Sequence, residues 1–206
     1  MLAPLNLTLV AITDDMRGDP ARVIARALAA ARGGATMIQL RLKDADARTL
    51  VEVARALVAS LPRDVPLIVN DRADVAIAAG AAGVHVGAED VPPAALRRVV
   101  PSDFIIGASV GSEAEVPFAA DADYVGIGPV YATDSKQDAG TAIGTEGLAE
   151  LVVRAKRPAV AIGGIDATNA AAAVQAGAAG VAAIRAIFGA RDPEQAARAI
   201  REAIRR

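Results

Sequence analysis

The chain has 206 residues, of which 53% are hydrophobic and 22% are charged, and its formal net charge is −2. This composition excludes a disordered chain, and the length fits one α/β domain with a sizeable core. The absence of cysteine excludes disulfides, thiolate nucleophiles and cysteine-bound metal centres, and 2% aromatic residues without a basic surplus argue against nucleic-acid binding.

The apolar residues predict neither a membrane span nor a secretion signal. No stretch reaches the ~18 consecutive apolar residues of a membrane span. The N-terminal segment MLAPLNLTLVAITDD lacks the basic start and the cleavage site of a signal peptide. We therefore expect a cytoplasmic protein that has no membrane partner and forms a single domain over residues 1–206.

Short apolar runs alternate with alanine-rich helical segments along the chain, which is typical of parallel βα units. The predicted strands are Leu7–Ile12, Thr36–Leu40, Leu67–Val69, Gly83–Val86, Phe104–Ala108, Tyr124–Ile127, Ala159–Ile162 and Gly180–Ile184. The predicted helices lie near 20–33, 46–60, 73–79, 93–99, 112–120, 146–155, 167–176 and 193–205. Eight of each predict an α/β fold, a single (β/α)8 TIM barrel. The alternative, a doubly wound open sheet, would normally have a glycine-rich loop where this chain reads AITDD.

In such a barrel the active site lies at the carboxyl ends of the strands, so the polar residues that follow each apolar run are informative. Gln39, Arg41 and Lys43 alternate after the second strand, which places their side chains on one face. Arg41 and Lys43 would form a three-cation cluster with Lys136 that is suited to a diphosphate. A solvated rim with salt bridges is the alternative interpretation.

Asp71 and Asp90 follow the third and fourth strands. Two carboxylates that converge beside cations suit Mg²⁺, which prefers oxygen ligands. Alternatively, either aspartate caps the helix that follows it, and Asp90, just before Val-Pro-Pro, fits that alternative best.

His85 is the only histidine in the chain, which forbids a multi-histidine metal site. It either packs in the core or faces a substrate. Gly163 and Gly164 follow the seventh strand, at a position where barrels commonly bind a phosphate. The long connection 128–145 predicts a substrate cover, in which Thr133, Ser135 and Lys136 would contact anionic oxygens.

The segments IQLRLK, VNDRADVA, GVHVGAED, IIGASV, DYVGIGPVYATDSKQD and VAIGGI occur in this order along the chain. In these segments the chain resembles the thiamine phosphate synthase family, and the resemblance runs from ITDD to the last helix. It implies a transferase that joins hydroxymethylpyrimidine diphosphate to a thiazole phosphate carboxylate, or its tautomer, and releases diphosphate with Mg²⁺ as cofactor. The C–O bond to diphosphate would ionise first, and the thiazole nitrogen would capture the resulting cation.

The resemblance also assigns residues to roles. It implies that the pyrimidine diphosphate is held by Gln39, Arg41, Lys43, Asn70 and Lys136, and the metal by Asp71 and Asp90. It places Ser109 and His85 along the pyrimidine, and Thr133, Ser135, Gly164 and Ile184 toward the thiazole phosphate. Lys43, Lys136 and Ser109 are the residues expected to act in catalysis. Family members often carry serine where this chain has Arg185, which either strengthens phosphate binding or crowds the site.

Three other functions share this fold. A thiazole tautomerase would need no diphosphate site, and a phosphosugar isomerase would need an acid/base pair. A non-catalytic thiamine-precursor-binding protein would not need the metal ligands. Small-molecule substrates are the expected partners, and the sequence leaves a homodimer open.

Overall fold

The computed structural model describes residues 5–14, 19–133 and 140–205. Eight parallel strands close into one barrel in chain order, and β1 pairs with both β2 and β8. The strands are β1 (Leu9–Ile12), β2 (Met37–Leu40), β3 (Leu67–Asn70), β4 (Gly83–Val86), β5 (Ile105–Val110), β6 (Tyr124–Ile127), β7 (Ala159–Ala161) and β8 (Gly180–Ala183). This confirms the predicted (β/α)8 TIM barrel.

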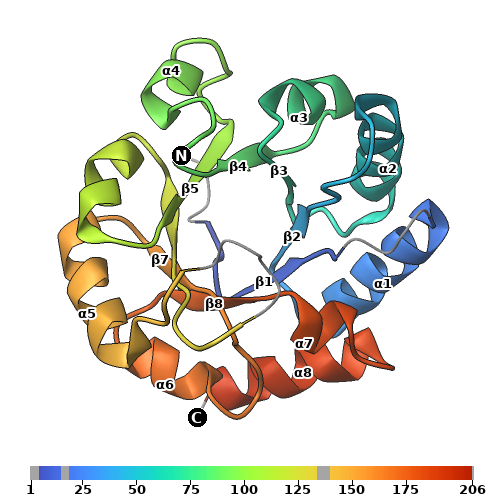
Figure 1. Ribbon diagram of the computed structural model, residues 1–206. Coiled ribbons are helices and arrows are strands. Elements are labelled where there is room, and N and C mark those ends of the chain that lie inside the picture. The colour runs from blue at the N-terminus through green and yellow to red at the C-terminus, as the bar shows by residue number, and fades with distance from the viewer. Residues whose placement is uncertain (1–4, 15–18, 134–139, 206) are drawn as a thin grey trace.

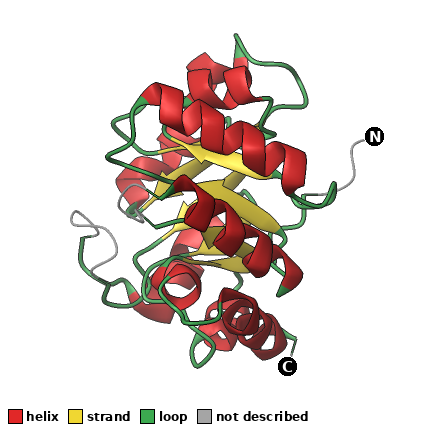
Figure 2. Ribbon diagram, turned by 90° about the vertical axis from the view of Figure 1, so that its right-hand side faces the viewer, coloured by secondary structure: helices red, strands yellow, loops and turns green. Residues whose placement is uncertain are grey.

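The helices surround the strands as an outer ring (Figures 1 and 2). They are α1 (Pro20–Arg32), α2 (Ala47–Ser60), α3 (Ala73–Ala79), α4 (Pro93–Arg97), the 3₁₀ helix η1 (Glu113–Ala119), α5 (Gly144–Ala155), α6 (Ala170–Gln175), α7 (Arg185–Phe188) and α8 (Pro193–Ile204). Within the described part of the chain, no helix combines the length and the apolar character needed to cross a membrane.

Aspartate caps begin three of the long helices. The carboxylates of Asp19, Asp46 and Asp192 each accept a hydrogen bond from the backbone N–H three residues later, at 3.1, 2.9 and 3.0 Å. These bonds satisfy N–H groups that have no partner inside the helix. They fix the start of α1, α2 and α8.

Three helical segments differ from the predicted ones. The segment after β5 is a 3₁₀ helix with Pro117 inside it, and proline lacks the N–H that an α-helix would use. The helix α6 begins only at Ala170, because the Asp166 carboxylate accepts bonds from the N–H and hydroxyl of Thr168 in a turn. The short helix α7 after β8 was not among the predicted helices.

Apolar residues form two layers on the two sides of the barrel wall. The larger layer lies between strands and helices and includes Leu9, Ile38 and Val84. The smaller layer includes Val10, Met37, Ile68 and Tyr124. Successive side chains of a strand point to opposite faces, so every second residue points into the barrel. Beyond the smaller apolar layer, the next inward-pointing residues lie at the carboxyl ends of the strands. Those positions carry the polar residues of the site.

Candidate active site

A cavity of about 1130 Å³ opens at the carboxyl ends of the strands. Its lining includes every described residue that the sequence placed in the site: Gln39, Arg41, Lys43, Asn70, Asp71, His85, Asp90, Ser109, Thr133, Gly164, Ile184 and Arg185. Ser135 and Lys136 lie outside the described residues. The structure thus brings together residues from six of the eight strand ends and from the loop after β6, while their individual roles stay predictions.

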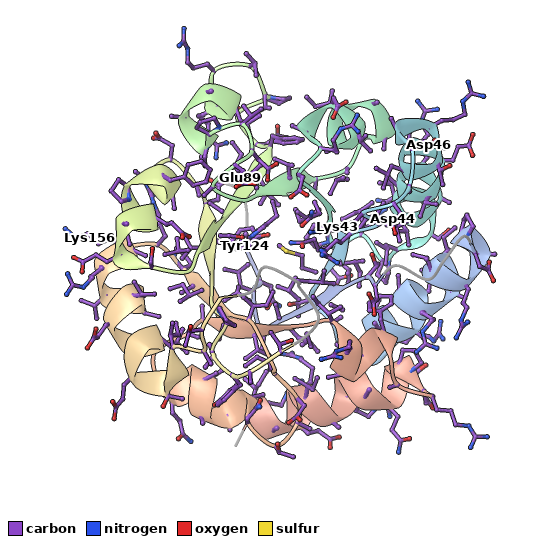
Figure 3. The ribbon with its side chains drawn as sticks, viewed as in Figure 1. Lys43, Asp44, Asp46, Glu89, Tyr124 and Lys156 are labelled. Carbon is purple, nitrogen blue, oxygen red and sulfur yellow. The ribbon has the colours of Figure 1, made fainter. Side chains whose placement is uncertain are left out.

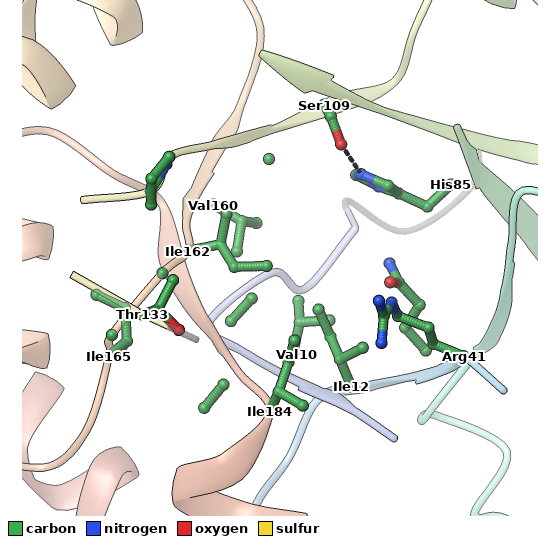
Figure 4. Close-up of a pocket in the computed structure, with 18 of the residues that line it drawn as sticks. Val10, Ile12, Arg41, His85, Ser109, Thr133, Val160, Ile162, Ile165 and Ile184 are labelled. Carbon is green, nitrogen blue, oxygen red and sulfur yellow. Dashed lines mark hydrogen bonds between the residues drawn. The ribbon is translucent and has the colours of Figure 1, made fainter. Parts of the chain in front are cut away.

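The polar end of β2 is held in place by β1. Gln39 is 4% exposed and Arg41 9%, whereas Lys43 is exposed at the opening. The backbone N–H of Arg41 donates to the hydroxyl oxygen of Thr13 at 2.8 Å, and that hydroxyl donates to the carbonyl of Arg41 at 2.9 Å. Figure 4 shows the Arg41 side chain among the residues that line the cavity. The two more buried residues of this segment therefore do not form a solvated rim.

Asp71 stands directly after β3 in an uncommon backbone conformation. Its φ is 62°, in the left-handed region that asparagine and aspartate tolerate better than most residues. Its N–H donates to the carbonyl of His85 at 2.8 Å, which ties this turn to β4. The carboxylate is thereby directed to the cavity mouth beside the residues that end β4.

The two aspartates influence each other. The pKa of Asp71 is raised to about 6, first by loss of solvation and then by the negative charge of Asp90, while Lys43 and Arg41 oppose the rise. Asp90 accepts a hydrogen bond from the N–H of Gly87 at 2.7 Å. These interactions place two carboxylates and two cations within electrostatic reach of one another.

Neither aspartate is the N-cap of the helix that follows. The N-cap of α3 is Arg72 and that of α4 is Pro92, and neither helix start has a side-chain cap bond. Asp90 instead closes the turn that begins at Gly87. The helix-capping alternative is therefore wrong for both residues.

The donor set suits Mg²⁺ better than a metal that demands a complete protein cage. Within the described ranges, no three His, Cys, Asp or Glu side chains gather as a metal site. Mg²⁺ commonly uses one or two protein carboxylates and completes its shell with water and substrate phosphate oxygens. Two carboxylates that repel each other, with a raised pKa at Asp71, fit such an ion.

His85 is half-buried and reaches the cavity from β4. Its Nε2 lies 3.1 Å from the hydroxyl oxygen of Ser109 on β5, and its Nδ1 lies 3.0 Å from the phenolic oxygen of Tyr124 on β6. Figure 4 shows the Ser109 contact as a dashed line. The imidazole is therefore both hydrogen-bonded inside the barrel and part of the cavity lining, which combines the two interpretations that the sequence left open.

The sequence interpretation missed Tyr124, which lines the cavity, and Thr13, which holds the segment after β2. Tyr124 is fully buried and lines the cavity, within the ring of helices in Figure 3. Its sequence signal was an isolated tyrosine in an aliphatic strand, in a chain with only two tyrosines. Thr13 gave no signal of its own, because its partner Arg41 is 28 residues away.

One part of the cavity wall is aliphatic. Val10, Ile12, Val160, Ile162 and Ile184 lie on this side, away from His85 and Ser109 (Figure 4). Such a wall offers no hydrogen bonds and excludes water from one side of a bound ring. The site can thus hold a flat, partly apolar group between an aliphatic and a polar surface.

The loop after β6 is fastened to the end of β7. The N–H of Val130 donates to Ile162 at 2.8 Å and that of Tyr131 to Gly163 at 3.0 Å. Gly163 and Gly164 have φ of 95° and 64°, and an added Cβ at Gly164 would stand 2.8 Å from the carbonyl oxygen of Ala132. The glycines therefore permit a close approach that brings Thr133 to the cavity.

Arg185 begins α7 directly after β8 and is exposed at the cavity edge. Ile184, half-buried, precedes it, and its carbonyl accepts the N–H of Phe188 at 2.8 Å. The sequence had read both residues at the end of the last strand. In the structure they form the junction between that strand and the short helix.

A closed parallel barrel with cations, paired carboxylates and a half-apolar cavity at its strand ends defines a TIM-barrel enzyme that acts on a small anionic substrate. The thiamine monophosphate synthase family matches residues 9–187. A thiamine-phosphate synthase of Xanthobacter autotrophicus is 48% identical over 99% of this chain and 98% of its own length, and one of Methanoculleus marisnigri is 48% identical over 97% and 96%. This chain belongs to the thiamine monophosphate synthase family.

Solved structures agree with this assignment. A thiamine phosphate pyrophosphorylase from Pyrococcus furiosus is 38% identical, covers 98% of this chain and 97% of its own, and superposes with a TM-score of 0.87. A 3-hexulose-6-phosphate synthase superposes with a TM-score of 0.71 at 22% identity, which reflects the shared barrel alone.

Proposed function

We propose that this chain condenses hydroxymethylpyrimidine diphosphate with a thiazole phosphate, as the carboxylate or its tautomer, to give thiamine phosphate and diphosphate. Membership of the thiamine monophosphate synthase family supports this transferase activity. The observation that carries the proposal for this cavity is the grouping of Arg41 and Lys43 with Asp71 and Asp90.

The diphosphate would lie toward the polar end of β2. Arg41 offers a planar guanidinium for two phosphate oxygens, and Lys43 offers a mobile point charge. Asn70, which follows on β3, adds a neutral hydrogen-bonding side chain at the same side of the cavity. Lys136, outside the described residues, would complete the cation cluster from the loop after β6.

Asp71 and Asp90 would hold Mg²⁺ between the protein and the diphosphate. When bound, Mg²⁺ supplies positive charge to the oxygen atoms of the departing group. Through the metal, the two carboxylates would orient the diphosphate relative to Arg41. Without the metal, their negative charge would repel the diphosphate, which is itself an anion.

The proposed reaction is a dissociative displacement. The C–O bond breaks with its electron pair on the diphosphate, and the lone pair of the thiazole nitrogen forms the new C–N bond to the pyrimidine methyl carbon. No protein nucleophile takes part. Preorganised positive charge from Arg41 and Lys43 stabilises the leaving group, while the wall formed by Val10, Ile12 and Ile162 keeps water from the cation.

The thiazole phosphate would lie toward the ends of β6, β7 and β8. Thr133, Gly164, Ile184 and Arg185 line that side of the cavity, and Ser135 would join them from outside the described residues. We assign Arg185 to the phosphate rather than to crowding, because it is exposed at the edge of the cavity, where its positive charge can attract a phosphate.

A homodimer and a cytoplasmic location belong to the same proposal. Light scattering of the purified protein and fractionation of cells that express it would test them. A monomer at working concentration or a membrane-bound fraction would contradict these two parts without affecting the reaction.

The experiment for the reaction follows thiamine phosphate in mixtures of the purified chain with both substrates, first with Mg²⁺ and then with a chelator. We expect product only with the metal. A matched mixture with the thiazole tautomer alone tests the tautomerase alternative by following its isomerisation. Absence of thiamine phosphate in the presence of Mg²⁺ would overturn the proposal.

A further inference from the structure

His85, Gly107 and Tyr124 stand in one row across three neighbouring strands. The register pairs His85 with Gly107 and Gly107 with Tyr124. Side chains at paired positions of adjacent strands point to the same side of the sheet. Because the middle residue has no side chain, the histidine and tyrosine rings can meet across β5.

Glycine is required for this meeting. A Cβ added at Gly107 would stand 2.3 Å from the Tyr124 ring and 2.4 Å from Nδ1 of His85. At Gly126, which pairs with Ser109, it would stand 3.2 Å from Cε1 of the same histidine. Two inward positions of the barrel are thus kept free for the imidazole and the phenol, whose ring centroids are 5.4 Å apart.

The contacts form a chain of hydrogen bonds from Tyr124 through His85 to Ser109. Tyr124 Oη lies 3.0 Å from His85 Nδ1, and His85 Nε2 lies 3.1 Å from Ser109 Oγ. Burial raises the pKa of Tyr124 above its usual range, so the phenol keeps its proton, while the nearby Gln39 side chain has a smaller, opposite effect.

The single proton of the phenol then decides the direction of the chain. Among the described residues, His85 Nδ1 is the hydrogen-bonding partner that the structure places within reach of the phenolic O–H, at 3.0 Å. A proton on Nδ1 would leave the buried phenolic O–H without an acceptor, which is costly. Nδ1 therefore accepts, and the imidazole proton is on Nε2.

We propose that Tyr124 is a positioning residue that holds His85 in the Nε2-protonated tautomer, so that Ser109 accepts from His85 and presents its own hydroxyl hydrogen to the substrate. The donor then faces an acceptor atom of the bound ring, such as an unprotonated ring nitrogen. The identity of that ring rests on the proposed function, whereas the tautomer does not. The site would disfavour a ring that presents an N–H at this point, because two donors would face each other.

The tautomer can be read directly, because His85 is the only histidine. Heteronuclear NMR of the full-length, nitrogen-labelled protein at mildly alkaline pH distinguishes protonated from unprotonated ring nitrogens. We expect a proton on Nε2 in the parent protein and a shift toward a mixture of tautomers in Tyr124→Phe. Tyr131→Phe removes the other phenol of the chain and should leave the imidazole spectrum unchanged. A proton on Nδ1 in the parent protein would overturn the proposal, as would an unchanged spectrum in Tyr124→Phe.

Kinetics separates positioning from simple support of the fold. Ser109→Ala and Tyr124→Phe should each lower kcat/KM for the pyrimidine diphosphate about five- to tenfold, the range of one hydrogen bond. The double variant should lose no more than Ser109→Ala alone, because Tyr124 acts through that hydroxyl. Additive losses would overturn the proposal. If the parent protein made no thiamine phosphate, the proposed reaction would fail while the NMR result would still decide the tautomer.

Discussion

Thr13 and Arg41 are joined by two hydrogen bonds between side chain and backbone. The Thr13 hydroxyl accepts from the N–H of Arg41 at 2.8 Å and donates to its carbonyl at 2.9 Å. Thr13 is completely buried, so no solvent can replace these bonds. The hydroxyl continues the β1–β2 ladder by one residue beyond the end of β2 and fixes the backbone from which the guanidinium extends.

Thr13→Val should therefore destabilise the protein and weaken diphosphate binding together. The substitution keeps the shape of the side chain but leaves a buried N–H and a buried carbonyl without partners, at a cost of about 1–3 kcal/mol. We expect a lower free energy of unfolding in denaturant titrations and a raised KM for the pyrimidine diphosphate. Thr13→Ser, which keeps the hydroxyl, should restore both, and a variant Thr13→Val with parental KM would contradict the anchoring role.

Asp71→Asn should raise the Mg²⁺ concentration needed for half-maximal activity and lower kcat. An amide oxygen carries no charge, so we expect at least about a tenfold change in metal requirement, as is usual when a metal site is disturbed. Asp74→Asn is the matched control, because Asp74 pairs with Arg72 at 2.8 Å outside the cavity lining. Titration of activity with Mg²⁺ measures both, and equal curves for parent and Asp71→Asn would contradict metal binding by Asp71.

The same substitution should change how stability depends on pH when no divalent metal is present. The pKa of Asp71 in the folded protein is about 6, above the ordinary value of 3.8. Its contribution to stability is therefore fully present below 3.8 and is lost as pH rises through 6. Relative to the parent, Asp71→Asn should become more stable as pH increases from about 4 to about 7. Thermal unfolding in chelator measures this, and a difference that does not vary with pH would contradict the raised pKa.

Arg41→Met should weaken diphosphate binding more than it weakens the fold. Methionine fills part of the same volume but lacks the charged fork, and truncation of a buried charge-assisted contact costs about 2–5 kcal/mol of binding. We expect a much higher KM for the pyrimidine diphosphate and little change in KM for the thiazole phosphate. Steady-state kinetics with each substrate varied in turn would show this split, whereas equal effects on both KM values would place Arg41 elsewhere.

The barrel could be predicted because each strand is a short, mostly apolar run and each long helix repeats its apolar residues at helical spacing. The helix α7 could not, since four residues, RAIF, are too few to show a helical period. The late start of α6 could not be predicted either, but for a different reason. It depends on the Asp166 carboxylate bonding to Thr168, which competes locally with the first turn of a helix.

The site was predictable where it follows from topology alone. Parallel strands end at one edge, so Gln39, Asp71 and Asp90 could be placed together without knowing their contacts. The pairing of His85 with Tyr124 could not be predicted, because 39 residues separate them and an isolated tyrosine in an apolar run looks like core. Only the register, with Gly107 between them, brings the two rings together.

Gly163→Ala should cost far more stability than the same change at Gly80. Both glycines have positive φ, 95° and 71°, so both substitutions pay for a left-handed conformation, about 1–2 kcal/mol. At Gly80 nothing lies within 4 Å of the added Cβ, whereas at Gly163 that atom would stand 2.5 Å from the Cα of Pro129. Overpacking against backbone adds about 1–3 kcal/mol.

Because the carbonyl of Gly163 also accepts the N–H of Tyr131, Gly163→Ala should displace the segment that carries Thr133 and raise KM for the thiazole phosphate. Denaturant unfolding and kinetics of both variants test this, and equal losses at the two glycines would show that the loop after β6 does not need this close approach.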